Sequence, residues 1–144
     1  MPPATDPRRY EYRALHWFRR LVGLGLALNL LFIVPGLLAP RLLEAWAAVG
    51  ITNTPHWLQN TALLLAIITV LYIPVIRDPF RYLFVSVTVV GGRFAAGVLF
   101  LFGLLFLDYP QGMLVLAASD LTLSALQALA LQRMLADGDP RAGW

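Results

Sequence analysis

The sequence has no cysteine, no lysine and only two histidines among its 144 residues. Without cysteine, the chain cannot form disulfides, hold an iron–sulfur cluster through thiolates, attach a c-type haem or carry out thiol–disulfide exchange. Charge is also scarce, because Asp, Glu, Lys and Arg make up 13% of the residues, against about 25% in an ordinary soluble protein. Disordered, collagenous and disulfide-stapled chains are therefore excluded.

Apolar sequence is what the chain has in abundance. Hydrophobic residues make up 59% of it, and the mean hydropathy is +0.70. Four apolar stretches, at residues 21–38, 57–76, 82–107 and 113–131, are close to or above the ~20 helical residues that cross ~30 Å of hydrocarbon. The sequence predicts an all-α fold, an integral membrane four-helix bundle that forms a single membrane domain over residues 1–144.

A shorter amphipathic segment at residues 41–49 separates the first two stretches. Its Arg41, Glu44 and Trp46 suit a helix that lies at the membrane interface, and Gly50 is expected to end that helix. We therefore expect a short interfacial helix between the first and second membrane-spanning helices.

The arginines are distributed unevenly along the chain. Nine of them precede the first stretch, join the second to the third, or follow the fourth: Arg8, Arg9, Arg13, Arg19, Arg20, Arg77, Arg81, Arg133 and Arg141. The links on the other side hold only Arg41. Because basic residues collect on the cytoplasmic side, we expect a multi-pass protein of the bacterial inner (plasma) membrane with both termini in the cytoplasm.

Polar residues interrupt three of the apolar stretches: Arg93 in the third, Asp120 in the fourth and Asn29 in the first. Charged side chains are costly at this depth and are usually functional. Counting 1.5 Å per residue from the turn at Pro110 leaves about 10 Å along the axis between Arg93 and Asp120. Arg93 then has three interpretations: an ion pair with Asp120, snorkelling to the cytoplasmic headgroups, or a site for an anionic ligand, a proton or a partner subunit. Asp120 either pairs with Arg93 or accepts a hydrogen bond from a neighbour such as Asn29.

Three pairs of small residues have the four-residue spacing that lets membrane helices approach each other closely. The pairs are Gly23 with Ala27, Gly91 with Ala95, and Gly92 with Ala96. We expect these pairs to pack within the bundle, and a surface for another subunit is the alternative. Thr69 and Ser124 are expected to form hydrogen bonds between helices.

Polar residues at the cytoplasmic boundary form a second candidate surface for lipid headgroups or a partner. They are Arg19, Arg20, Arg77, Asp78 and Arg81. Pro79 is expected to separate two helices, with Asp78 as an N-cap in front of it. A pure topology anchor on anionic lipids and a docking point for a cytosolic partner are both consistent with this link.

Catalytic and cofactor chemistry has little support in the sequence. His16 and His56 are expected at opposite membrane faces, about 30 Å apart, so that they cannot ligate one haem within a chain. No Ser/His/Asp set is expected to converge, and the sequence has no metal-spaced carboxylate cluster or phosphate-binding glycine loop. We predict a non-enzymatic chain with no catalytic residue, no metal, no cofactor of its own and no nucleic-acid partner, although a bound lipid or quinone fits its composition.

The chain resembles the DoxX-like class of small bacterial four-helix membrane proteins. The features that carry the resemblance are an arginine-led first helix, the exit from Phe32 to Pro40 into an amphipathic segment, the Arg77-Asp-Pro79 link, and an arginine-containing third helix ahead of an Asp-bearing fourth. The resemblance implies an association with respiratory or quinone-linked membrane complexes. It assigns no catalytic residue.

Three functional hypotheses follow. The leading one is a non-catalytic subunit that packs against and stabilises a larger membrane complex, of a respiratory or other electron-transfer kind. The alternative is a small homodimeric proton-linked transporter or channel that uses Asp120 and Arg93. The third is a membrane enzyme that binds a lipid or a quinone. The partners expected are thus the lipid bilayer and either other membrane subunits or further copies of the chain.

Overall fold

The computed structural model describes residues 8–48 and 56–138. These residues form six helices and no strand: α1 (Arg8–Leu38), α2 (Pro40–Ala47), α3 (His56–Val70), α4 (Tyr72–Arg77), α5 (Leu83–Phe106) and α6 (Met113–Asp137). The all-α prediction is therefore confirmed.

Four helical segments within the described residues are long and apolar enough to cross a membrane. They are Arg13–Leu38, His56–Arg77, Leu83–Phe106 and Met113–Asp137. Two helices run past the predicted stretches, because α1 begins before residue 21 and α6 continues beyond residue 131. Hydropathy marks only the part of a helix that suits hydrocarbon, whereas backbone hydrogen bonding continues into the flanking polar residues.

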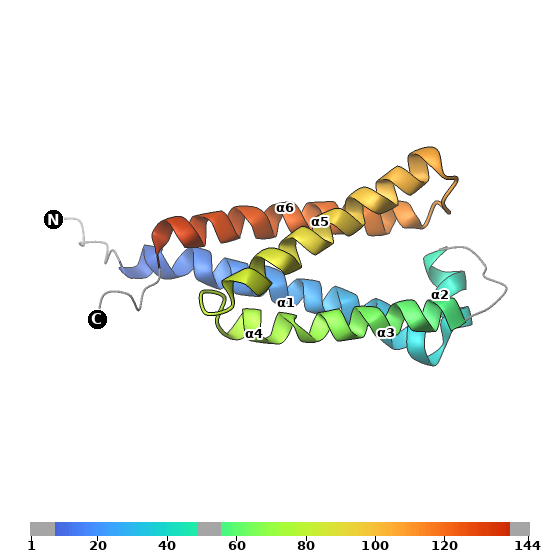
Figure 1. Ribbon diagram of the computed structural model, residues 1–144, viewed down its shortest axis with the longest axis horizontal. Helices are drawn as coiled ribbons and strands as arrows, with labels where there is room; N and C mark the ends of the chain where they lie inside the picture. Colours follow the sequence, from blue (N-terminus) through green and yellow to red (C-terminus); the bar gives the residue numbers. More distant parts are fainter. Residues whose placement is uncertain (1–7, 49–55, 139–144) are drawn as a thin grey trace.

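The second span is interrupted at Leu71, between α3 and α4. The Leu71 N–H donates to the Ile68 carbonyl at 3.0 Å, which tightens the last turn of α3. Pro74 explains the break, since it has no N–H and its ring clashes with the carbonyl four residues earlier, that of Val70. The chain continues past the break as α4, roughly in line with α3 (Figure 1).

A short helix, α2, is present where the interfacial helix was expected, at Pro40–Ala47 rather than at residues 41–49. It ends at Ala48, which adopts the left-handed conformation with φ 48°. The predicted stop at Gly50 lies outside the described residues. The end of α2 touches the link between α5 and α6, because a Cβ at Gly112 would overlap the carbonyl groups of Ala47 and Ala48.

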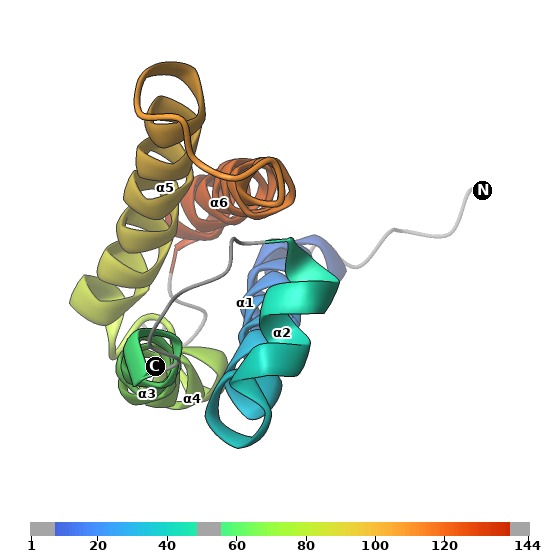
Figure 2. The same cartoon turned by 90° about the vertical axis from the view of Figure 1, so that its right-hand side faces the viewer.

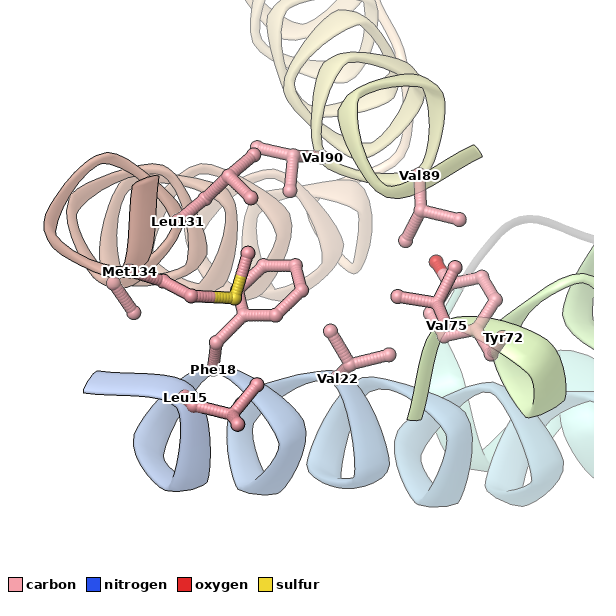
Figure 3. Packing of buried hydrophobic residues seen from close by; sticks show 10 residues of the cluster. Leu15, Phe18, Val22, Tyr72, Val75, Val89, Val90, Leu131 and Met134 are labelled. Carbon is pink, nitrogen blue, oxygen red and sulfur yellow. The ribbon is translucent and has the colours of Figure 1, made fainter. Parts of the chain in front are cut away.

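A closely packed apolar core lies at the end of the bundle where α1 begins and α6 ends (Figure 3). Its residues recur every three or four positions, as expected for the inner face of a helix. The buried members are Leu15, Phe18 and Val22 of α1, Tyr72 and Val75 of α4, Val89 and Val90 of α5, and Ala130, Leu131 and Met134 of α6.

The helices associate in a definite order. α6 packs along both α5 and α1, and α1 also packs against α3 and α4. α5 meets α4 near its own start but makes no broad contact with α3 in the described part of the chain. Figures 1 and 2 show α5 inclined across α6 and diverging from α3 towards the α2 end. Most of α5 is therefore covered on one face only.

The outer surface of the four spans is apolar. Leu31, Ile67, Phe84, Leu105 and Val115 are large hydrophobic residues, and each is more than half exposed. A soluble monomer rarely carries apolar patches of this extent, whereas a bilayer accepts them. The structure is thus the predicted membrane four-helix bundle, a multi-pass fold in a lipid bilayer.

Candidate functional site

Arg93 lies in the middle of α5 with its side chain turned into the bundle, and it is only 7% exposed. Its Nη1 donates to Asp120 Oδ1 at 2.5 Å, and its Nη2 donates to Asn29 Oδ1 at 2.8 Å. Nη2 also lies 3.2 Å from the Tyr72 hydroxyl and 3.3 Å from the Gly25 carbonyl, both of which accept. The bonds of this one side chain reach α1, α4 and α6.

Of the interpretations of Arg93, the structure contains the ion pair with Asp120, and the Arg93 side chain does not snorkel to the headgroups. The side chain of Arg93 is 5% exposed and that of Asp120 is 17% exposed. The inclination of α5 across α6 (Figure 1) reduces its rise along the bundle axis, so that the two side chains meet despite the separation counted from the sequence. A charge-assisted bond in these low-dielectric surroundings is stronger than the same bond in water.

Asn29 connects this ion pair to the second span. Its Oδ1 accepts from Arg93, and its Nδ2 donates to Thr69 Oγ1 at 2.8 Å. The ring of Tyr72 also lies beneath the guanidinium, with 5.9 Å from Arg93 Cζ to the ring centroid. We call Asn29, Thr69, Tyr72, Arg93 and Asp120 the polar cluster. Its members come from five helices and from all four spans.

Gly25 and Gln127 complete the surroundings of Arg93. A Cβ at Gly25 would lie 3.2 Å from both Arg93 Nη2 and Gln127 Nε2, so a glycine lets these side chains approach the α1 backbone. Gln127 is fully buried, and its Nε2 donates to the Leu21 carbonyl at 3.0 Å. A second polar tie therefore joins α6 to α1, seven residues after Asp120.

The sequence analysis did not identify Gly25, Tyr72 or Gln127. A signal for each is nevertheless present, because residues three, four or seven apart share a helix face. Gly25 precedes Asn29 by four residues, Tyr72 follows Thr69 by three, and Gln127 follows Asp120 by seven. A search of the positions three, four and seven residues from each intramembrane polar residue would have found all three.

Ser124 does not form the expected bond between helices. Its hydroxyl donates to the Leu121 carbonyl of its own helix at 3.0 Å. Serine often bonds to the preceding turn in this way, and such a bond joins no two helices.

The small-residue pairs do not pack within the bundle, which corrects the expectation. Gly91, Gly92, Ala27 and Ala95 are exposed, and Gly23 and Ala96 are partly exposed. A Cβ at Gly23, Gly91 or Gly92 would meet no atom within 4 Å. For Gly91 and Ala95 the reason is the orientation of α5 about its axis: Arg93 faces inward, and residues two positions away lie about 200° around the helix. Gly25, Gly36 and Gly97 are glycines that do face a neighbouring helix.

The arginines expected at the cytoplasmic boundary lie near the ends of the helices. Arg19 donates through Nη2 to the Arg77 carbonyl at 2.7 Å, which ties α1 to the end of α4. Arg20, Arg77 and Arg81 are exposed, and Arg20 lies 6.0 Å from the ring of Trp17. Asp78 Oδ1 accepts from the Arg81 N–H at 3.1 Å, within the turn at residues 79–82. The prediction that Asp78 is a helix N-cap is wrong, because α5 begins at Leu83 and its N-cap position is Tyr82.

The described residues hold no group of three or more His, Cys, Asp or Glu side chains that suits a metal ion. His16 and His56 are both exposed; His16 lies in the first part of α1, and His56 is the first residue of α3. The starts of α1 and α3 lie near opposite ends of the bundle (Figure 1). The polar cluster is thus a hydrogen-bonded ion-pair network that joins four spans. Asp120 is its most accessible member, and it is the group through which the cluster would exchange a proton or contact a cation.

Comparison with family models, with curated proteins and with solved structures finds no match to this chain.

Proposed function

We propose that this protein is a non-catalytic membrane subunit that packs against another membrane protein through the outer face of α5. One observation carries the proposal: α5 is packed on one face only, and its opposite face is open. This outer face comprises Phe84, Thr88, Gly91, Ala95 and Phe102, all of them exposed. Its centre is the Gly91–Ala95 pair, and a Cβ at Gly91 would meet no atom within 4 Å.

The physical basis is close backbone approach. Lipid tails are as apolar as leucine, so helices in a membrane associate by packing and by hydrogen bonds rather than by hydrophobic burial. Small residues at a contact let two helices come close enough for extensive dispersion contact. The flanking Phe84 and Phe102 add large rings on either side of the small pair. Meanwhile the polar cluster holds the four spans together without the outer face.

The resemblance to DoxX-like proteins supports a finer proposal, that the partner belongs to a respiratory or quinone-linked complex. The membrane is then a bacterial inner membrane. The excess of arginine at the end that holds Arg19, Arg77 and Arg81 supports a cytoplasmic location for that end and for both termini.

The partner proposal is tested on the full chain with a C-terminal tag, extracted in mild detergent from the native membrane. Mass spectrometry and the absorption spectrum then identify what remains bound in stoichiometric amount. We expect a larger membrane subunit to co-purify. Replacing Gly91 and Ala95 with leucine is expected to reduce its recovery at least about tenfold, equivalent to about 1.4 kcal/mol of binding free energy.

The matched control is Ala128→Leu, which enlarges an exposed alanine on α6. It is expected to leave co-purification unchanged, because it lies on another helix and not on the outer face of α5. Recovery of the wild-type chain alone as a stable monomer, or equal partner loss in both variants, would contradict the proposal. A partner with haem absorption would support the electron-transfer assignment.

Orientation is tested by single cysteines, for which the cysteine-free sequence is well suited. Ala45 in α2 and Ala136 in α6 are exposed and lie towards opposite ends of the bundle. In spheroplasts, Ala45→Cys is expected to react with a membrane-impermeant maleimide, whereas Ala136→Cys is expected to react only after the membrane is opened. The reverse pattern would place the termini outside.

A second function is favoured by one feature of the polar cluster. Asp120 keeps 17% of its side chain accessible, while Arg93, Asn29, Thr69 and Tyr72 are all buried. A homodimeric proton-linked transporter would use such an accessible carboxylate beside a buried cation. Proton-coupled transport in liposomes that is lost in Asp120→Asn would establish this alternative, and in that case the chain would purify as a dimer without other subunits.

A further inference from the structure

An apolar groove lies between α1 and α2, at the end of the bundle away from Arg8 and Asp137. Its volume is about 570 Å³, and its lining is Leu30, Leu31, Val34 and Pro35 of α1 with Leu42, Leu43 and Trp46 of α2. This volume is within the ~300–1,000 Å³ of small-molecule sites. The lining is almost entirely apolar, which suits a hydrocarbon chain.

The geometry points to a binding site for one acyl chain of an anionic phospholipid in the leaflet that contains α2. The site does not depend on the proposed function, because it involves α1 and α2 and not the outer face of α5. Three observations carry the inference: the amphipathic character of α2, the depth of the groove, and the charge beside it.

The amphipathic character of α2 determines where the groove opens. Leu42, Leu43 and Trp46 share one side of this eight-residue helix and line the groove, whereas Arg41 lies on another side. Trp46 is 73% exposed, which suits the membrane–water boundary that tryptophan prefers. Figure 2 shows α2 beside the end of α1. The mouth of the groove is thus at headgroup level.

The depth of the groove follows from α1. Its lining residues on α1 run from Pro35 back to Leu30, and they continue from the α2 end towards the middle of the span. An acyl chain that enters beside α2 would therefore lie along α1, parallel to the other chains of that leaflet. Leu43, which is 1% exposed, forms part of the inner wall and packs near Gly36.

Charge selects the kind of lipid. Arg41 pairs with Glu44 at 3.3 Å, yet the Arg41 side chain is 60% exposed and that of Glu44 only 3%. The pair therefore turns its positive end outward, and Arg41 directly precedes Leu42, which lines the groove. Because an apolar groove alone gains little over bulk lipid tails, the phosphate of an anionic headgroup beside this guanidinium supplies the preference.

The test uses the full chain in detergent, with phosphatidylglycerol or phosphatidylcholine added at equal concentration and retained lipid counted by native mass spectrometry. The wild-type chain is expected to retain one phosphatidylglycerol at least about fivefold more than phosphatidylcholine. Val34→Trp fills the groove and is expected to reduce retention at least about fivefold. Its matched control, Val115→Trp, places the same bulk on an exposed apolar position of α6 and is expected to have no effect.

Arg41→Gln is the second variant, because it removes the charge and leaves the apolar lining intact. It is expected to abolish the preference for phosphatidylglycerol while a lipid is still retained. Equal retention in Val34→Trp and Val115→Trp would overturn the site. So would an equal number of both lipids on the wild-type chain, or a change of oligomeric mass in Val34→Trp, which would assign the groove to a second copy of the chain.

Discussion

Replacing Arg93 with methionine in the full chain is expected to lower the free energy of unfolding by about 3 kcal/mol or more. The variant removes the ion-pair partner that Asp120 has among the described residues, and it leaves Asn29 and Tyr72 without their bonds from the guanidinium. Neutral hydrogen bonds between membrane helices are worth only about 0.6 kcal/mol on average. Most of the loss therefore comes from the uncompensated carboxylate. The measurement is unfolding in mixed micelles, followed by helical circular dichroism.

The control is Arg81→Met, because Arg81 lies at an exposed position just before α5. An exposed substitution of this kind is expected to change stability by less than about 0.5 kcal/mol. The double variant Arg93→Met with Asp120→Leu separates charge from packing, since it removes both members of the pair. It is expected to recover much of the lost stability. A double variant no more stable than Arg93→Met, or a wild-type stability in Arg93→Met itself, would show that the ion pair does not hold the spans together.

The same cluster bears on the choice between the two proposed functions. A structural tie predicts that loss of Asp120 affects stability and partner recovery together. A transport site predicts that Asp120→Asn abolishes transport in a chain that is still folded and correctly oriented. The two outcomes differ because asparagine keeps the hydrogen-bonding shape of the side chain and removes its charge.

The number of spans and the presence of α2 follow directly from the sequence. Long apolar runs can be satisfied in a bilayer only by helices, since every backbone polar group must find its partner within the segment. The break in the second span was not predicted, although Pro74 carries a signal for it, because proline removes a specific helical bond. The contact between Arg93 and Asp120 was harder to predict. It depends on the inclination of α5 across α6, which side-chain packing determines and hydropathy does not.

The orientation of the small residues was the principal error, and it has a physical explanation. Gly91 and Arg93 are two residues apart, so one helix cannot direct both into the same bundle. The polar residue determines which face of the helix turns inward, because placing a guanidinium against polar partners changes the free energy far more than placing a glycine at a helix contact. Had that priority been applied, Val89 and Gly97 would have been predicted as inward neighbours of Arg93, as the structure has them.

Gly97→Ala is expected to destabilise the chain by up to about 2 kcal/mol, although alanine is the better helix former. A Cβ at Gly97 would lie 2.8 Å from Leu121 Cγ and 3.1 Å from the Leu121 backbone nitrogen. Overpacking of this kind costs about 1–3 kcal/mol, and the gain in helix propensity offsets about 1 kcal/mol of it. Because Leu121 directly follows Asp120, the added methyl group would push α5 away from α6 at the place where Arg93 and Asp120 meet.

Gly91→Ala in the same helix supplies the matched comparison, and its sign is expected to be opposite. A Cβ at Gly91 would meet no atom within 4 Å, so only the helix-propensity gain of at most about 1 kcal/mol remains. Both variants add one methyl group to α5 six residues apart, and the same unfolding measurement applies to both. Equal effects would mean that α5 does not present Gly97 to α6, and the inward orientation of Arg93, one turn earlier on the same face, would then be wrong as well.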